Sequence, residues 1–135
     1  MGFLSKIFGK KEEMGIKEIE MEMAKLKKKV NAEMIAIFGI GGRLKGLPLI
    51  YVSNNESDMK KITARLYEII EPVYNIDNER VLRDMIINYD NSTLFFKQIM
   101  ANIGYFAVFK DKSDLLNLKQ WIYKKVDYLK ELLHD

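Results

Sequence analysis

The sequence has 135 residues and a mass of 15.8 kDa, with 48% hydrophobic and 30% charged residues, which is typical of one folded domain and excludes a disordered chain or a membrane bundle. Cysteine is absent and the single histidine is residue 134, which excludes disulfides, thiolate metal sites and histidine-dependent nucleophilic triads. The net charge is +3, and lysines outnumber arginines by eighteen to four. Because base recognition relies on arginine, no nucleic-acid partner is predicted.

Residues 1–14 are predicted to form a basic amphipathic segment ahead of the domain. Its apolar residues recur at helical spacing among lysines: Phe3, Leu4, Ile7 and Phe8, with Lys6 and Lys10. The segment is too short to span a membrane, and Lys6 stands where a myristoylation signal needs Ser or Thr. Two interpretations remain open: an anchor that inserts apolar side chains into a membrane surface or a partner's groove, and a frayed or self-packed end.

Three helices are predicted from apolar residues three or four positions apart. The first covers residues 15–30, with the stripe Ile16, Ile19, Met23, Leu26 and Val30. The second is capped within residues 54–58 and ended or kinked by Pro72, and its stripe is wider than one sheet face needs: Met59, Ile62, Leu66, Ile69, Ile70 and Val73. The last is capped by Ser113 or Asp114 and continues to Leu133, with Trp121 as a boundary core residue.

Five strands are predicted between these helices. Residues 34–38 and 47–52 flank a glycine-rich hairpin, which lacks the Gly-Lys-Ser/Thr ending of a phosphate-binding loop. Residues 80–89 alternate with apolar side chains on both faces, which predicts a strand covered on each side, and strands at 93–99 and 105–109 follow. The order α-β-β-α-β-β-β-α predicts an α+β fold: a five-stranded antiparallel sheet with helices on both faces.

No catalytic or metal-binding signature is visible in the sequence. The acidic residues that could be paired stand beside turns or strand edges, where solvated carboxylates are ordinary: Glu79, Asp84, Asp90 and Asp111. The spaced acidic residues of a calcium loop are absent. The residues by themselves therefore predict a binding or assembly domain, not an enzyme, with no cofactor and no metal.

The element order over residues 15–133 resembles the roadblock/dynein light chain family, which includes Mgl-type polarity regulators. The resemblance is carried by the hairpin, the capped second helix, and the run DMIINYDNSTLFFKQ followed by Gly104 and YFAVF, whereas Pro72 and the long hairpin depart from it. It implies a single roadblock/profilin-like domain over residues 15–135. It also implies a cytoplasmic homodimer that binds a small Ras-like GTPase as a non-enzymatic scaffold or regulator, and the polarity regulators accelerate GTP hydrolysis by their partner.

The resemblance further implies where partners bind, because family members pair their third strands and pack their second helices together. Carried onto this sequence, the dimer interface contains Tyr67 and Ile70 on the helix and Val81, Arg83, Met85, Ile87 and Tyr89 on the edge strand. Exposed side chains of the second helix are expected to contact the GTPase: Lys60, Lys61, Arg65 and Glu68. A solvated helix face is the alternative interpretation of these four. The N-terminal segment would add peripheral contact with a membrane.

Two other function classes remain open on the sequence. A longin-like trafficking domain shares a five-stranded sheet but normally begins with strands and lacks a leading helix such as residues 16–30. A profilin-like or PAS-like ligand sensor needs an internal cavity with convergent polar groups, which the apolar strand positions do not indicate.

Overall fold

The computed structural model describes residues 10–133, so Phe3, Leu4, Lys6, Ile7 and Phe8 lie outside the described residues, as does the side chain of Lys10. In chain order the elements are α2 (Lys10–Lys29), β1 (Met34–Gly39), the 3-10 turn η1 (Gly42–Leu44), β2 (Pro48–Ser53), α3 (Glu56–Tyr74), β3 (Asp84–Asn88), β4 (Thr93–Met100), β5 (Ile103–Phe109), the 3-10 turn η2 (Lys112–Asp114) and α4 (Leu115–Leu132). This order confirms the predicted sequence of helices and strands.

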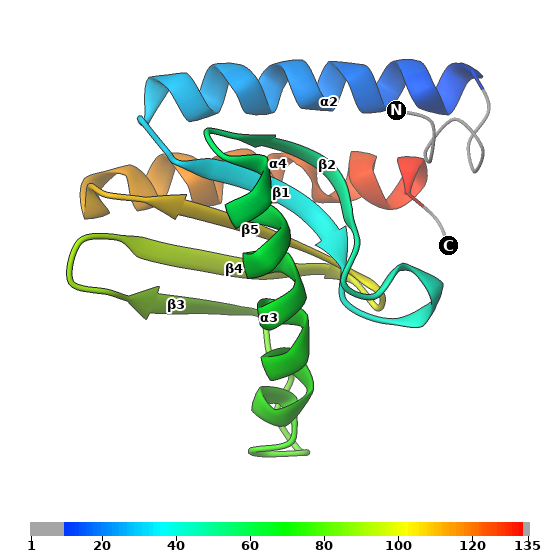
Figure 1. The fold of residues 1–135 in the computed structure, drawn as a ribbon. Helices are drawn as coiled ribbons and strands as arrows, with labels where there is room; N and C mark the ends of the chain where they lie inside the picture. The colour runs from blue at the N-terminus through cyan, green and yellow to red at the C-terminus, as the bar shows by residue number, and fades with distance from the viewer. Residues whose placement is uncertain (1–9, 134–135) are drawn as a thin grey trace.

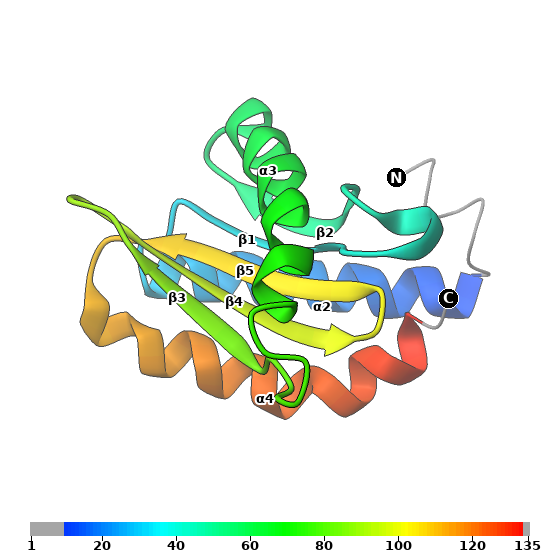
Figure 2. The same ribbon diagram turned by 90° about the horizontal axis from the view of Figure 1, so that it is seen from below.

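The strands form one antiparallel sheet in the order β2-β1-β5-β4-β3 (Figure 1). The two outermost strands are therefore β2 and β3, and each leaves one edge of the sheet. Helices α2 and α4 lie side by side on one face, and α3 crosses the opposite face (Figure 2). The predicted α+β sheet with helices on both faces is confirmed.

The core beneath α2 and α4 is built from the predicted helical stripes. Ile16 and Ile19 of α2 and Ile122 of α4 are fully buried against alternate residues of β1 and β5. Helix α2 begins at Lys10, five residues before the predicted start, and the predicted boundary between residues 14 and 15 falls within it. The extra turn carries no buried stripe; instead Glu12 and Glu13 favour a helix N-terminus electrostatically, a signal that apolar spacing does not contain.

Polar contacts at the boundary of this core tie α2 to α4. Trp121 Nε1 donates a hydrogen bond to Glu22 Oε1 at 3.2 Å, and Lys125 Nζ lies 2.9 Å from the same oxygen. The Trp121 ring lies 5.9 Å from that of Tyr105, so its prediction as a boundary core residue is confirmed. Burial raises the pKa of Tyr105 far above its usual range, and its hydroxyl has no hydrogen-bond partner within residues 10–133.

Helix α3 begins at the cap that the sequence predicts. Asn55 Oδ1 accepts a hydrogen bond from Asp58 N at 3.1 Å, which satisfies one of the free N–H groups of the first turn. The residues that α3 buries against the sheet are Met59, Thr63, Leu66 and Ile70. Thr63 tolerates full burial because its Oγ1 donates to the Met59 carbonyl oxygen at 2.8 Å.

The two other predicted helix ends have different outcomes. Pro72 lies in the last turn of α3, which ends at Tyr74, as expected for proline. Asp114 occupies the N-cap position of α4, as predicted, but its side chain makes no capping hydrogen bond. Asp111 accepts a hydrogen bond from Ser113 N at 2.9 Å, which opens η2 and lowers the pKa of the Asp111 carboxyl.

The glycines of the β1–β2 connection serve backbone geometry. A Cβ atom at Gly39 would lie 1.6 Å from the Leu44 carbonyl oxygen, so only glycine allows this close approach. Gly42 and Gly46 have φ angles of 61° and 76°, a left-handed conformation that glycine adopts without strain. The interpretation of this segment as a turn, instead of a phosphate-binding loop, agrees with this geometry.

The strand predicted over residues 80–89 is too long, since β3 covers only Asp84–Asn88. Arg83 O still accepts a hydrogen bond from Gln98 N at 3.4 Å, but the register of β4 shifts just beyond Gln98. Val81 therefore has no paired residue on β4 in the described part of the chain. Pairing stops where the neighbouring strand becomes irregular.

The prediction that this strand is covered on each side is also wrong. Met85 and Ile87 pack against the core beneath α3, whereas Ile86, on the other face, is 43% exposed. The reason is the position of β3 at the end of the sheet, where α4 packs mainly against β4. Tyr123 is the α4 residue that reaches β3 by a hydrogen bond, donating to Asp84 Oδ2 at 3.0 Å.

Candidate partner-binding site

The outer edge of β3 carries backbone groups that the rest of the sheet does not use. Arg83 O accepts a hydrogen bond from Gln98 N of β4 at 3.4 Å, and Tyr89 N donates to Ser92 O in the β3–β4 turn at 2.8 Å. Because bonded residues alternate in an antiparallel pair, the odd-numbered residues between them also face β4. The N–H and C=O groups that point away from the sheet belong to Asp84, Ile86 and Asn88.

A groove of about 650 Å³ lies between α3 and the β3–β4 turn. Its floor contains the buried side chains of Leu66, Leu94 and Val108. Ile69 lies on the α3 side and is 41% exposed, and Tyr89 lies on the strand side. An apolar groove thus adjoins an unpaired strand edge, which together form a surface suited to a protein partner.

The predicted interface residues of the strand lie along this surface. Met85 and Ile87 are half-buried on β3, and Tyr89 is exposed beside the groove. Val81 and Arg83 are exposed ahead of the strand. All five lie close to the free edge, although three of them are outside β3 itself.

The two predicted interface residues of the helix do not lie in this groove. Ile70 is 3% exposed and packs into the core of its own chain, and its predicted place near a partner's helix stays a prediction. Tyr67 is half-buried on another side of α3, where its ring lies close to Gly46 of the hairpin. The exposed apolar residue on the groove side of α3 is the neighbour of Ile70, Ile69.

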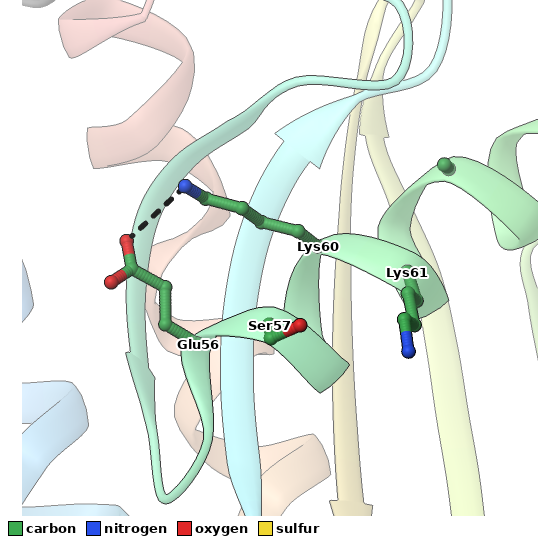
Figure 3. A pocket seen from close by; sticks show the side chains of 5 residues that line it. Glu56, Ser57, Lys60 and Lys61 are labelled. Carbon is green, nitrogen blue, oxygen red and sulfur yellow. Dashed lines mark ion pairs between the residues drawn. The ribbon is translucent and has the colours of Figure 1, made fainter.

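The four side chains predicted to contact a GTPase are all exposed, but they fall into two groups. Arg65 and Glu68 line the groove beside Ile69. Lys60 and Lys61 line a separate depression near the start of α3, together with Glu56 (Figure 3). The structure therefore places the four on one helix surface without gathering them at one point.

The start of α3 also holds a linked set of polar groups. Tyr51 OH on β2 donates to Glu56 Oε1 at 2.6 Å. Lys60 Nζ lies 3.6 Å from the same oxygen, as the dashed line in Figure 3 marks. The hydrogen bond from Tyr51 and the charge of Lys60 lower the pKa of Glu56. The bond to Glu56 raises the pKa of Tyr51 to about 12. Glu56 is thus held as an anion in the first turn of the helix.

Sequence reasoning did not single out Ile69 and Ile86 as surface residues. The unusual width of the apolar stripe on the second helix was the available signal for Ile69, since one sheet face could not cover it. For Ile86 there was no signal, because alternation along a strand does not tell which face a helix leaves uncovered.

Within residues 10–133, no cluster of three or more histidine, cysteine, aspartate or glutamate side chains could hold a metal ion. None of the helices in this part of the chain is both long and apolar enough to cross a membrane. The leading helix that distinguishes the roadblock arrangement from a longin-like domain is present as α2.

Comparison by sequence finds no family model that matches the chain and no curated protein that is significantly similar to it. Comparison by structure does find similar proteins. MglB of Myxococcus xanthus superposes with a TM-score of 0.71 at 10% identity, covering 89% of this chain and 93% of MglB. The gliding protein MglB of Thermus thermophilus gives 0.69 at 10% identity, with 85% and 88% covered.

A Roadblock/LC7 domain from Streptomyces avermitilis gives a TM-score of 0.69 at 12% identity, covering 83% of this chain and 94% of that domain. Identities this low establish the likeness of the fold and do not extend to residue roles. Because the coverage is nearly complete on both sides and the element order agrees, the chain has the roadblock fold of the MglB and Roadblock/LC7 structures.

Proposed function

We propose that this protein is a homodimeric, non-enzymatic scaffold or regulator of a small Ras-like GTPase. The observation that carries the proposal is the unpaired edge of β3 beside the apolar groove under α3. The roadblock fold supports it, and a further structure with this fold is described as MglB in a tetrameric arrangement, which is a case of self-assembly in that protein.

The geometry of β3 favours a second copy as its partner. If two β3 strands pair antiparallel with the greatest overlap, Ile86 lies opposite its own copy and Asp84 lies opposite Asn88 of the partner subunit. These are the residues whose backbone groups face outward, so each would exchange hydrogen bonds with its counterpart. A closed two-fold pairing also removes the exposed edge as a template for aggregation.

In the same two-fold arrangement the second subunit covers the groove. Ile69 and Tyr89 stand on its two sides, exposed enough to be covered by the second subunit. In this proposal Ile69 takes the place that the sequence assigned to Ile70. The exposed Lys60, Lys61, Arg65 and Glu68 on α3 remain the proposed contacts for the GTPase.

Proline substitution tests the dimer sharply, because it removes one N–H group at a chosen position. Ile86→Pro deletes an outward-facing N–H and leaves the β3–β4 ladder intact, so we expect a folded monomer in sedimentation equilibrium where the wild type is a dimer. The matched variant Ile87→Pro deletes an N–H that faces β4 and is expected to lower stability strongly. A wild-type monomer, or an Ile86→Pro dimer, would overturn this part of the proposal.

The GTPase is tested with small Ras-like GTPases from the same genome, each loaded with GDP or a non-hydrolysable GTP analogue. Binding to at least one of them, weakened by Lys60→Glu with Lys61→Glu, supports the proposal, and the rate of GTP hydrolysis in the complex separates a regulator from a scaffold. Failure of a folded wild-type dimer to bind any of them would overturn it.

The N-terminal segment adds a third part: recruitment to a membrane surface through its apolar and basic residues. Removing residues 1–9 leaves α2 whole, since this helix begins at Lys10. The shortened protein is expected to lose most of its binding to anionic vesicles. Unchanged binding would refute anchoring by this segment and leave the dimer proposal untouched.

A further inference from the structure

Helix α2 exposes two large apolar side chains that nothing in the described chain covers. Met14 is 67% exposed and Met21 is 62% exposed. They are seven residues apart, which is close to two full helical turns, so they lie in one line along the helix. That line is opposite the buried stripe that contains Ile16 and Ile19.

Lysines surround the two methionines on the same outer side of α2. Lys28 continues the line by another seven residues, and Lys17 and Lys25 flank it, all three exposed. Glu18 is the exposed acidic residue on this side, so the outer stripe carries net positive charge. A line of flexible apolar side chains among lysines matches an anionic surface with an apolar interior.

The position of α2 leaves this stripe free of the proposed protein contacts. Helices α2 and α4 form a layer on one face of the sheet, and α3 lies on the other (Figure 2). The 20 residues of α2 make a straight rod about 30 Å long, which can lie flat on a surface. A molecule resting on this layer would turn α3 away from that surface, toward solvent and protein partners.

We propose that the outer stripe of α2, defined by Met14, Lys17, Met21, Lys25 and Lys28, binds an anionic lipid surface. This inference rests on the proposed membrane recruitment, and it extends the contact from the N-terminal segment into the folded domain. Residues 1–9 carry apolar side chains and Lys6 and lead directly into the helix at Lys10. The methionines enter the interfacial region, and the lysines contact the headgroups.

Co-sedimentation with vesicles tests the electrostatic part of this contact. The probe is phosphatidylcholine vesicles with and without phosphatidylserine at about one lipid in three, at low and high salt. A variant with Lys17, Lys25 and Lys28 changed to Gln is expected to lose about 100-fold in partitioning onto anionic vesicles. The matched variant with Arg43, Lys45 and Arg80 changed to Gln removes the same charge at exposed positions outside α2 and α3 and is expected to change it less than about 3-fold.

Insertion is tested with a polarity-sensitive fluorophore on a single introduced cysteine, since the chain has none of its own. Met21→Cys carries the label on the stripe, and Ile76→Cys carries it at an even more exposed apolar position beyond α3. On anionic vesicles we expect a blue shift of emission for the first label and none for the second. Full-length protein is used for both.

The outcomes separate the two membrane contacts. Vesicle binding that persists without a blue shift at position 21, or that the two triple-Gln variants weaken equally, would overturn the inference while leaving the N-terminal anchor in place. No binding of wild type to anionic vesicles would overturn both, and the dimer measured by sedimentation would not be affected. A blue shift that depends on protein concentration without lipid would identify a second copy as the occupant and would also overturn it.

Discussion

The two faces of the sheet differ in how much of their apolar surface the helices of the chain cover. Among the described residues, the core beneath α2 and α4 contains twenty-two buried residues and the core beneath α3 contains ten. Two helices cover the first face side by side, whereas a single helix crosses the second and leaves a groove toward β3. The first face has therefore buried its apolar surface within the chain except at its β3 end, where Ile86 stays 43% exposed, whereas the second retains an apolar groove that a partner can bury.

This contrast shows how one domain divides its tasks. The face with two helices supplies most of the buried area, and burial of apolar area is the largest favourable contribution to folding. The face with one helix can then leave Ile69 and the β3 edge exposed without loss of the fold. Three predictions test this division, from the largest effect to the smallest.

The first prediction compares one isoleucine from each face in the monomeric Ile86→Pro background. Ile122→Ala removes a fully buried side chain from the core beneath α4 and is expected to lower the free energy of unfolding by about 3 kcal/mol. Ile69→Ala, on the exposed side of α3, is expected to cost less than about 1 kcal/mol. Urea denaturation measures both. Equal losses would show that the α3 face is as complete as the other.

The second prediction concerns the hydroxyl of Tyr105 in the larger core. Because this hydroxyl is buried and has no hydrogen-bond partner among the described residues, Tyr105→Phe is expected to raise the free energy of unfolding by about 1 kcal/mol. Tyr51→Phe is the matched control, since it removes a hydroxyl that donates to Glu56 and is expected to lower stability. A loss of stability in Tyr105→Phe would contradict the prediction.

The third prediction is a pH dependence at the start of α3. The pKa of Glu56 is lowered from 4.5 by the hydrogen bond from Tyr51 and by Lys60, so its contribution to stability is present above pH 4.5 and is lost as the pH falls through the lowered pKa. Glu56→Gln is therefore expected to be slightly less stable than wild type at pH 7, and the difference should shrink in acid. Thermal unfolding at pH 7 and below pH 4 measures it. A difference that grows in acid would have the wrong sign.

Much of this architecture was predictable from local patterns. The stripe of α2 and the cap at Asn55 depend on residues within a few positions of each other, and both are present as predicted. The five-stranded antiparallel sheet followed from the sequence of elements, and the place of β3 at its edge followed from the resemblance, whereas the full strand order was not predicted. The contact between α2 and α4 through Glu22 and Trp121 joins residues 99 apart, which local patterns do not contain.

The predictions for the buried residues of α3 and for the length of β3 differ from the structure for physical reasons, which involve distant residues or side-chain hydrogen bonds. Thr63 has a polar side chain, but it is buried in the core because its hydroxyl donates a hydrogen bond to the Met59 carbonyl oxygen. The buried stripe of α3 therefore includes Ile70 and leaves Ile69 outside, a choice between neighbours that apolar spacing could not make. β3 is shorter than predicted because its pairing with β4 stops where β4 becomes irregular beyond Gln98. The residues of β3 alone do not indicate where the adjacent strand becomes irregular.

The pairing of β1 with β5 at the centre of the sheet has a consequence for synthesis on the ribosome. β1 is complete at Gly39, but its inner neighbour spans Ile103–Phe109, and the stripe of α2 meets its α4 counterpart only after Ile122. Such long-range contacts slow folding and leave apolar surface exposed in the meantime. The emerging chain holds an amphipathic helix and a hairpin that can cover each other only in part until β5 and α4 are made, and chaperones that bind nascent chains would find their target in that interval.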